Sequence, residues 1–73
     1  MTSAGGRGHV TNRIRKLREA AGLTQAELAD RVGATRQTII AVEAEKYAPS
    51  LELAFRLARA FRVPFETVFH YED

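Results

Sequence analysis

The sequence has 73 residues, a formal net charge of +2 at pH 7 and no cysteine, and 27% of its residues are charged. A chain of this length forms one small domain and leaves little material to enclose an active site. Without cysteine it has neither disulfides nor thiolate zinc sites, and no apolar run approaches the roughly 18 residues that a membrane helix needs, so we expect a cytoplasmic protein.

The basic residues are unevenly distributed along the chain. The first 18 residues contain five basic residues and no acidic ones, whereas the rest contain six basic and nine acidic ones. A positive end suits an anionic partner, but a basic stretch is often only a solvated surface, so the charge alone favours nucleic acid only slightly. Residues 1–9 are rich in glycine and lack an apolar core, and we expect them to form a flexible arm outside the fold.

The remaining sequence, residues 10–73, shows repeated helix signals and almost no strand signal. Apolar residues spaced by three and four predict a first helix over residues 13–21. Thr11 or Asn12 can cap this helix, and Gly22 can supply the left-handed residue that ends it. We therefore expect the fold to begin with a short helix.

A second and a third helix follow after short turns. Thr24 and Glu27 have the spacing of a capping box, and Gly33 ends the second helix. Thr35 then caps a third helix over residues 36–44. Because only three residues separate the second and third helices, we expect them to meet at a steep angle.

Two more helices complete the expected fold. Pro49 cannot extend the third helix, and Ser50 caps a fourth helix over residues 51–61 whose wide apolar arc closes the core. Pro64 suits the first turn of a last helix over residues 65–69, where its missing amide proton is not needed. The sequence therefore predicts an all-α, compact five-helix domain.

The expected third helix has two different sides. At 100° per residue, Thr38, Ile39 and Val42 fall on one side. The other side lacks the mixed acidic and basic pairs that usually solubilise an exposed helix, and it consists of Arg36, Gln37, Ile40, Ala41 and Ala44. Arginine, glutamine and an aliphatic methyl group can recognise guanine, adenine and thymine edges, so this side suits DNA. Packing against the fourth helix is the alternative, and composition alone favours neither.

Several segments share their spacing with a known family, namely residues 23–29 (LTQAELA), Gly33, residues 35–39 (TRQTI), Glu43 and Pro49. Over about residues 12–69 they resemble the phage-repressor (Cro/C1, or Xre) helix-turn-helix family, and within it the very small stand-alone regulators. The resemblance implies a lambda-repressor-like, bacterial-type DNA-binding domain. Its helix-turn-helix, at about residues 24–44, places the second helix of the motif in the major groove of an operator.

The resemblance also implies roles for individual residues. We expect base contacts from the start and the outer side of the third helix, at Thr35, Arg36, Gln37, Ile40 and Ala41. We expect contacts with the DNA backbone from Arg13, Lys16, Thr24, Gln25, Thr38 and Lys46. For the three cations of this second set, a merely solvating charge is the alternative.

Arg18 and Glu43 match a family pair that links the first and third helices through a partly buried ion pair. Truncating one partner of such a pair costs roughly 3 to 5 kcal/mol, so we assign both residues a structural role. The chain also departs from the family pattern. Glu45 and Arg62 stand where glycines usually end helices, so either Glu45 is strained or the third helix runs on. Ala34 replaces a larger aliphatic residue and predicts a thinner core beside the turn.

A domain of this size recognises few base pairs, so we expect a homodimer on a palindromic operator whose half-sites lie about one DNA turn apart. Aromatic residues near the C-terminus are the expected interface, namely Phe55, Phe65, Phe69 and Tyr71. Closing the core is the alternative for Phe65 and Phe69. Residues 70–71 can also pair as a short edge strand with the same segment of the partner.

Catalysis is not expected of this sequence. His9 and His70 lie near opposite ends without metal-ligand spacing, and no nucleophile with a neighbouring base is recognisable, so we expect no enzyme activity, cofactor or metal. The expected function is that of a transcriptional regulator, with repression as the expected mode, on double-stranded DNA of the nucleoid. The alternative is an antitoxin or adaptor of the same fold that acts mainly through a protein partner such as a toxin.

Overall fold

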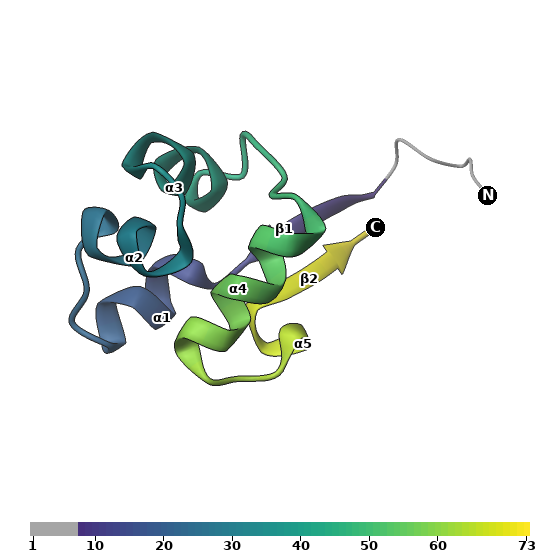
Figure 1. The fold of residues 1–73 in the computed structure, drawn as a ribbon. Coiled ribbons are helices and arrows are strands. Elements are labelled where there is room, and N and C mark those ends of the chain that lie inside the picture. The colour runs from purple at the N-terminus through teal and green to yellow at the C-terminus, as the bar shows by residue number, and fades with distance from the viewer. Residues whose placement is uncertain (1–7) are drawn as a thin grey trace.

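A computed structural model of the chain describes residues 8–73, and within them it forms five helices and a two-stranded antiparallel ribbon (Figure 1). The elements in chain order are β1 (His9–Asn12), α1 (Ile14–Ala20), α2 (Gln25–Val32), α3 (Arg36–Glu43), α4 (Leu51–Phe61), α5 (Phe65–Val68) and β2 (Phe69–Glu72). Residues 1–7, most of the expected arm, lie outside the described residues. His9, the last residue of that expected arm, is already part of β1.

The helices begin where polar side chains can bond the free amide groups of the first turn. The Thr24 hydroxyl accepts from the Glu27 N–H at 3.0 Å, and the Glu27 carboxylate accepts from the Thr24 N–H at 2.8 Å, which completes the expected capping box. The Thr35 and Ser50 hydroxyl groups accept from the Thr38 and Leu53 N–H groups and so cap α3 and α4, without the return bond of a capping box. The expectation that Thr11 or Asn12 caps α1 is wrong, because Arg13 occupies the cap position and makes no side-chain cap bond. The Asn12 side chain, one residue earlier, still accepts from the Ile14 N–H at 3.1 Å.

The structure shows how α3 and α4 end where the sequence lacks the usual glycines. Glu45 and Arg62 have φ values of 61° and 58°, so both residues adopt the left-handed conformation although neither is a glycine. Beyond α3, the Lys46 N–H donates to the Ala41 carbonyl at 3.0 Å, which is the bond that closes a helix after a left-handed residue. The third helix therefore ends in a strained residue instead of running on.

The core takes residues from every helix and from the start of β2. Its buried apolar residues are Ile14, Leu28, Ala29, Val32, Ile39, Val42, Ala54, Leu57, Ala58, Val68 and Phe69. Ala34 packs against this cluster as a half-buried residue. Burying these side chains removes apolar surface from water, which is the main stabilising contribution in a domain without disulfides.

The expectation of an all-α fold is wrong in one respect, because the two ends of the described chain pair as a ribbon. Val10 lies opposite Tyr71 and Thr11 lies opposite His70. Residues 70–71 therefore pair with β1 of the same chain, and their pairing with the same segment of a partner stays a prediction. Helix α5 ends one residue earlier than expected. Each strand has only four residues, and the partners are about sixty positions apart. So short an alternation is too weak a signal for a strand.

Figure 1 shows two ends of the molecule. α1, α2 and α3 gather at one end, α4 crosses the middle, and the ribbon and α5 form the other end. α2 and α3 pack against each other, and α4 packs on α1, α2 and α5. No helix in residues 8–73 is long and apolar enough to cross a membrane.

Candidate nucleic-acid interface

The outer side of α3 is open to solvent. Arg36 and Gln37 are exposed, Ile40 is 36% exposed and Ala41 is half-buried, whereas the inner residue Ile39 is fully buried. Helix α4 packs against α1, α2 and α5. The alternative that the outer side of α3 packs against α4 is therefore wrong. A row of mostly exposed side chains on α3 remains available to a partner.

The start of α3 is fixed by two threonines. The Thr35 hydroxyl accepts from the Thr38 N–H at 3.1 Å, and the two hydroxyl oxygens lie 3.0 Å apart. Thr35 is exposed and Thr38 is half-buried. Both residues therefore hold the first turn of α3 in place, directly beside Arg36 and Gln37.

An ion pair joins α1 to α3. The Arg18 Nε donates to Glu43 Oε2 at 2.7 Å, and its Nη2 donates to Oε1 at 3.3 Å. The side chains are only 12% and 6% exposed, so the pair is largely shielded from water. The hydrogen bond to Glu43 raises the pKa of Arg18 against the opposing effect of burial. The third Arg18 nitrogen, Nη1, donates to the Leu23 carbonyl at 2.9 Å, so one guanidinium holds α1, the turn before α2 and α3 together.

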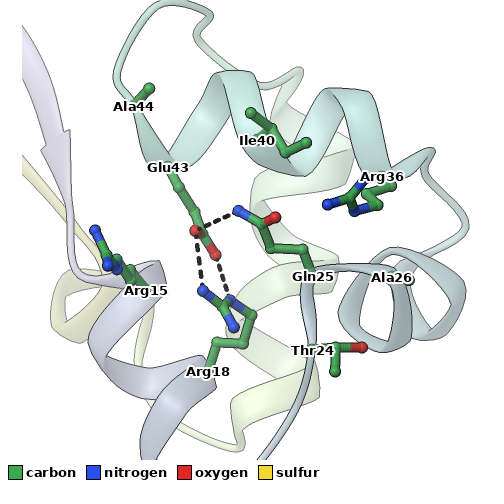
Figure 2. Close-up of a pocket in the computed structure, with 9 residues that line it drawn as sticks. All are labelled: Arg15, Arg18, Thr24, Gln25, Ala26, Arg36, Ile40, Glu43 and Ala44. Carbon is green, nitrogen blue, oxygen red and sulfur yellow. Dashed lines mark hydrogen bonds and ion pairs between the residues drawn. The ribbon is translucent and has the colours of Figure 1, made fainter.

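Gln25 joins the same network from the first turn of α2. Its Nε2 donates to Glu43 Oε1 at 3.2 Å, and Figure 2 shows its side chain reaching across to α3. Gln25 thus has a fixed position in which one of its amide protons is already bonded. The sequence indicated a phosphate contact for Gln25 but gave no sign of this bond, because it depends on how α2 packs against α3.

A hollow of about 600 Å³ opens between α1, the start of α2 and α3. It is lined by Arg15, Arg18, Thr24, Gln25, Ala26, Arg36, Ile40, Glu43 and Ala44 (Figure 2). Of the residues expected to contact DNA, the structure brings Thr24, Gln25, Arg36 and Ile40 together here. Arg15 was not among the expected residues. Arg15 stands three residues before Arg18 and so shares one side of α1 with it, and this spacing could have predicted that Arg15 lies beside the hollow.

The other expected backbone contacts lie around this region. Arg13 is exposed just before α1, and Lys16 is exposed on α1. Lys46 is exposed just after α3 and lines a separate recess beside β1. These three cations do not line the hollow itself. Within residues 8–73, His, Asp and Glu residues do not gather in groups of three or more that could hold a metal ion.

The aromatic residues near the C-terminus form a stack that runs from the surface into the core. The ring centroids of Phe55 and Phe65 are 5.3 Å apart, and those of Phe65 and Phe69 are 5.0 Å apart. Phe55 is 51% exposed, whereas Phe69 is only 7% exposed. The assignment of Phe69 to a dimer interface is therefore wrong, because its own chain already covers it. Phe65, in the middle, is half-buried.

A shallow apolar groove of about 440 Å³ lies beside this stack. Val10, Leu51 and Tyr71 line it and are 43%, 69% and 65% exposed. Tyr71 was expected at an interface from the sequence, whereas Val10 and Leu51 were not. Leu51 stands four residues before Phe55, so the two side chains share one side of α4, and this spacing could have found it. We call Val10, Leu51, Phe55 and Tyr71 the apolar surface.

Comparison with known proteins places this arrangement in a family. The model of the family described as helix-turn-helix matches residues 14–68. An uncharacterized HTH-type transcriptional regulator of Methanothermobacter thermautotrophicus is 60% identical over 61 residues, which cover 82% of this chain and 88% of that protein. The uncharacterized HTH-type transcriptional regulator MJ0272 of Methanocaldococcus jannaschii is 50% identical over 62 residues, which cover 85% of this chain and 94% of that protein.

A solved protein structure is also similar to this chain in fold and sequence. The restriction-modification controller protein C.AhdI from Aeromonas hydrophila has a TM-score of 0.70 and 33% sequence identity, over 74% of this chain and 82% of its own. The relatives include archaeal proteins, so the family is wider than the expected bacterial type. A family of regulators also agrees with the expectation that the chain is not an enzyme. The chain therefore belongs to the helix-turn-helix family of Cro/C1 type.

Proposed function

We propose that this protein is a sequence-specific DNA-binding transcriptional regulator that represses its targets by inserting α3 in the major groove as a homodimer. The observation that carries the proposal is the outer side of α3, which presents Arg36, Gln37 and Ile40 to solvent with no acidic residue among them. A carboxylate there would repel the phosphates that flank the groove. The Arg18–Glu43 ion pair holds this side in a fixed position.

In this proposal the outer side of α3 contacts bases. Arg36 and Gln37 can bond guanine and adenine edges, and Ile40 with Ala41 can lie against thymine methyl groups. Thr35 serves mainly as the cap that places Arg36, because its hydroxyl already accepts the Thr38 N–H. Their position at and near the start of α3 supports these roles, since helix-turn-helix proteins contact bases from that end of the recognition helix.

The proposed backbone contacts surround α3. At the start of α2 the Thr24 and Glu27 amide groups are bonded within the capping box, so the Gln25 and Ala26 amide groups are the ones proposed to meet a phosphate. The second amide proton and the carbonyl oxygen of Gln25 can bond DNA while its first proton stays on Glu43. The remaining proposed contacts are Arg13, Lys16, Thr38 and Lys46, and we add Arg15 because it lines the hollow.

The apolar surface supports the proposed homodimer. Val10, Leu51, Phe55 and Tyr71 expose apolar side chains on one region of a small protein, where burial against a second copy would remove them from water. Phe65 lies at the edge of this surface and supports the Phe55 ring. A two-fold dimer would present two copies of α3 to a palindromic operator of double-stranded DNA.

Selection of bound duplexes from a random library at stated salt tests the proposal. The wild type is compared with the double variant Arg36→Ala/Gln37→Ala and with Arg59→Ala, which removes an exposed arginine from α4 instead. We expect the wild type and Arg59→Ala to enrich one palindrome and the folded double variant to lose it. If the dimer neutralises about 6 to 10 phosphates, affinity falls roughly 10³-fold to 10⁵-fold between 50 and 200 mM salt.

The apolar surface also favours a second candidate, an antitoxin or adaptor that binds a protein partner such as a toxin there. A folded wild-type chain that enriches no duplex would contradict DNA recognition and favour this candidate. Equal enrichment by the double variant would contradict the roles given to Arg36 and Gln37.

A further inference from the structure

Asn12, the last residue of β1, links the ribbon to the end of the recognition helix. Its Nδ2 donates to the carbonyl of Val42 in the last turn of α3 at 2.8 Å. Its main-chain N–H faces the Glu45 carboxylate, with 3.4 Å between N and Oε2. Its Oδ1 accepts from the Ile14 N–H at 3.1 Å, at the start of α1. One half-buried side chain thus joins β1, α1 and the end of α3.

The link from Asn12 reaches a carbonyl in the last turn of α3. The Val42 carbonyl accepts from the Glu45 N–H at 3.0 Å, and the Asn12 amide is a second donor to it, at 2.8 Å and across 30 positions of sequence. Glu45, which is left-handed with φ of 61°, adds a second contact, because its carboxylate lies 3.4 Å from the Asn12 main-chain nitrogen. The residue that departs from the expected glycine is thus bonded to the ribbon.

The same strand also carries part of the apolar surface. Val10 stands two residues before Asn12, and alternate residues of a strand lie on the same side of it. Val10 pairs with Tyr71 across the ribbon, and both residues are exposed. The exposed pair Val10 and Tyr71 therefore lies only two residues along β1 from the bond between Asn12 and the end of α3.

We infer that Asn12 is a positioning residue that transmits the geometry of the dimer to α3 and so fixes the separation of the two half-sites in the operator. This inference rests on the proposed function, because it requires a dimer that recognises DNA through α3. With the bonds of Asn12 intact, the two copies of α3 in the dimer have one preferred separation. Without these bonds, each α3 still exposes the same outer side chains and keeps the Arg18–Glu43 ion pair, but its position relative to the ribbon is less strictly defined.

The experiment measures spacing and not affinity alone. A duplex library carries two copies of the half-site enriched by the wild type, separated by spacers of varied length. The variant Asn12→Asp keeps the acceptor for the Ile14 N–H but loses the donor to Val42. Gly22→Ala is the matched control, because it strains a left-handed residue, with φ of 71°, in the turn after α1 and makes no new contact. Asn12→Ser replaces Asn12→Asp if the latter does not fold.

For the wild type we expect strong preference for one spacer over spacers one base pair shorter or longer. In Asn12→Asp this preference falls about tenfold, an ordinary size for coupling between two sites, while Gly22→Ala keeps it. Unchanged spacing in the Asn12 variants, or an equal loss in Gly22→Ala, would overturn the inference and leave the proposed function standing. If the wild type enriches no half-site, the proposed function fails, and this inference fails with it.

Discussion

Glu45 and Arg62 each end a helix in a conformation that glycine adopts without cost. A side chain with a Cβ atom in this conformation crowds the neighbouring carbonyl, which costs roughly 1 to 2 kcal/mol per residue. Both residues are exposed, so burial of their side chains does not offset this cost. At Glu45 the weak bond from the Asn12 N–H recovers part of it.

Replacing Glu45 by glycine is therefore predicted to raise the free energy of unfolding by about 1 kcal/mol. The gain comes from relief of the backbone strain and is measured by urea denaturation of the wild type and the variant. Glu45→Ala is the control, because it removes the carboxylate but retains the Cβ atom. Equal stabilisation by alanine and glycine would show that the carboxylate, and not the backbone, causes the effect.

The capping box at the start of α2 links the stability of that helix to pH. The bond from the Thr24 main-chain N–H is the main reason that the pKa of Glu27 is lowered. A carboxylate whose pKa is lowered in the folded state stabilises the fold fully above the pKa of the unfolded chain, about 4.3 for glutamate. This stabilisation disappears as the pH falls through the lower pKa of the folded state.

Replacing Glu27 by glutamine is predicted to remove this dependence on pH. We expect the wild type to be the more stable protein at pH 7 and the difference to shrink as the pH falls below about 4.3, because the Glu27 carboxylate takes up a proton. Denaturant unfolding of both proteins at several pH values between 7 and 3 measures the difference. A difference that stays constant over this range would contradict the assignment.

α4 and β2 place two rings of the aromatic stack, Phe55 and Phe69, in different environments. Phe69→Ala is predicted to lower the free energy of unfolding by about 3 to 5 kcal/mol, because it opens a cavity in the core. Phe55→Ala, at a ring that is 51% exposed, is predicted to cost less than about 1 kcal/mol in the monomer. Denaturation at low protein concentration compares the two, and equal costs would contradict the burial of Phe69.

At the scale of the whole molecule, the two ends of the fold have separate proposed tasks. α3 lies with α1 and α2 at one end, and the ribbon lies at the other, with α4 between them (Figure 1). The hollow opens beside α3. The ribbon supplies Val10 and Tyr71 to the apolar surface, and α4 supplies Leu51 and Phe55. Substitutions of Leu51 and Phe55 on α4 can therefore change the proposed dimer without touching α3, whereas the ribbon is bonded to the end of α3 through Asn12.

The double variant Leu51→Ser/Phe55→Ser is predicted to be a folded monomer, because both side chains are exposed and contribute little to the core. Sedimentation measures the oligomeric state, and binding to the full palindrome is expected to fall to the level of a single half-site. Tyr47→Ser is the control, since Tyr47 is 52% exposed but lies outside the groove. A double variant that stays dimeric would place the interface elsewhere.

Local signals correctly predicted most of the helices. The Thr24 capping box, the Thr35 and Ser50 caps and the left-handed Gly33 depend on a few neighbouring residues, so spacing alone reveals them. The ribbon was missed because its pairing joins distant segments of four residues each. The Phe69 assignment failed for a related reason, since burial depends on where β2 leads that side chain.

The order of the helices, the caps of α2, α3 and α4, and the two sides of α3 could be predicted from the amino-acid pattern alone, because these features arise from interactions over three or four residues. Only the tertiary structure decided which aromatic residues are exposed, that Gln25 bonds Glu43, and that Asn12 connects the ribbon to the end of α3. These contacts join residues 18 or more positions apart or depend on burial. Such contacts are set by how the helices pack, for which no short spacing in the sequence gives a signal.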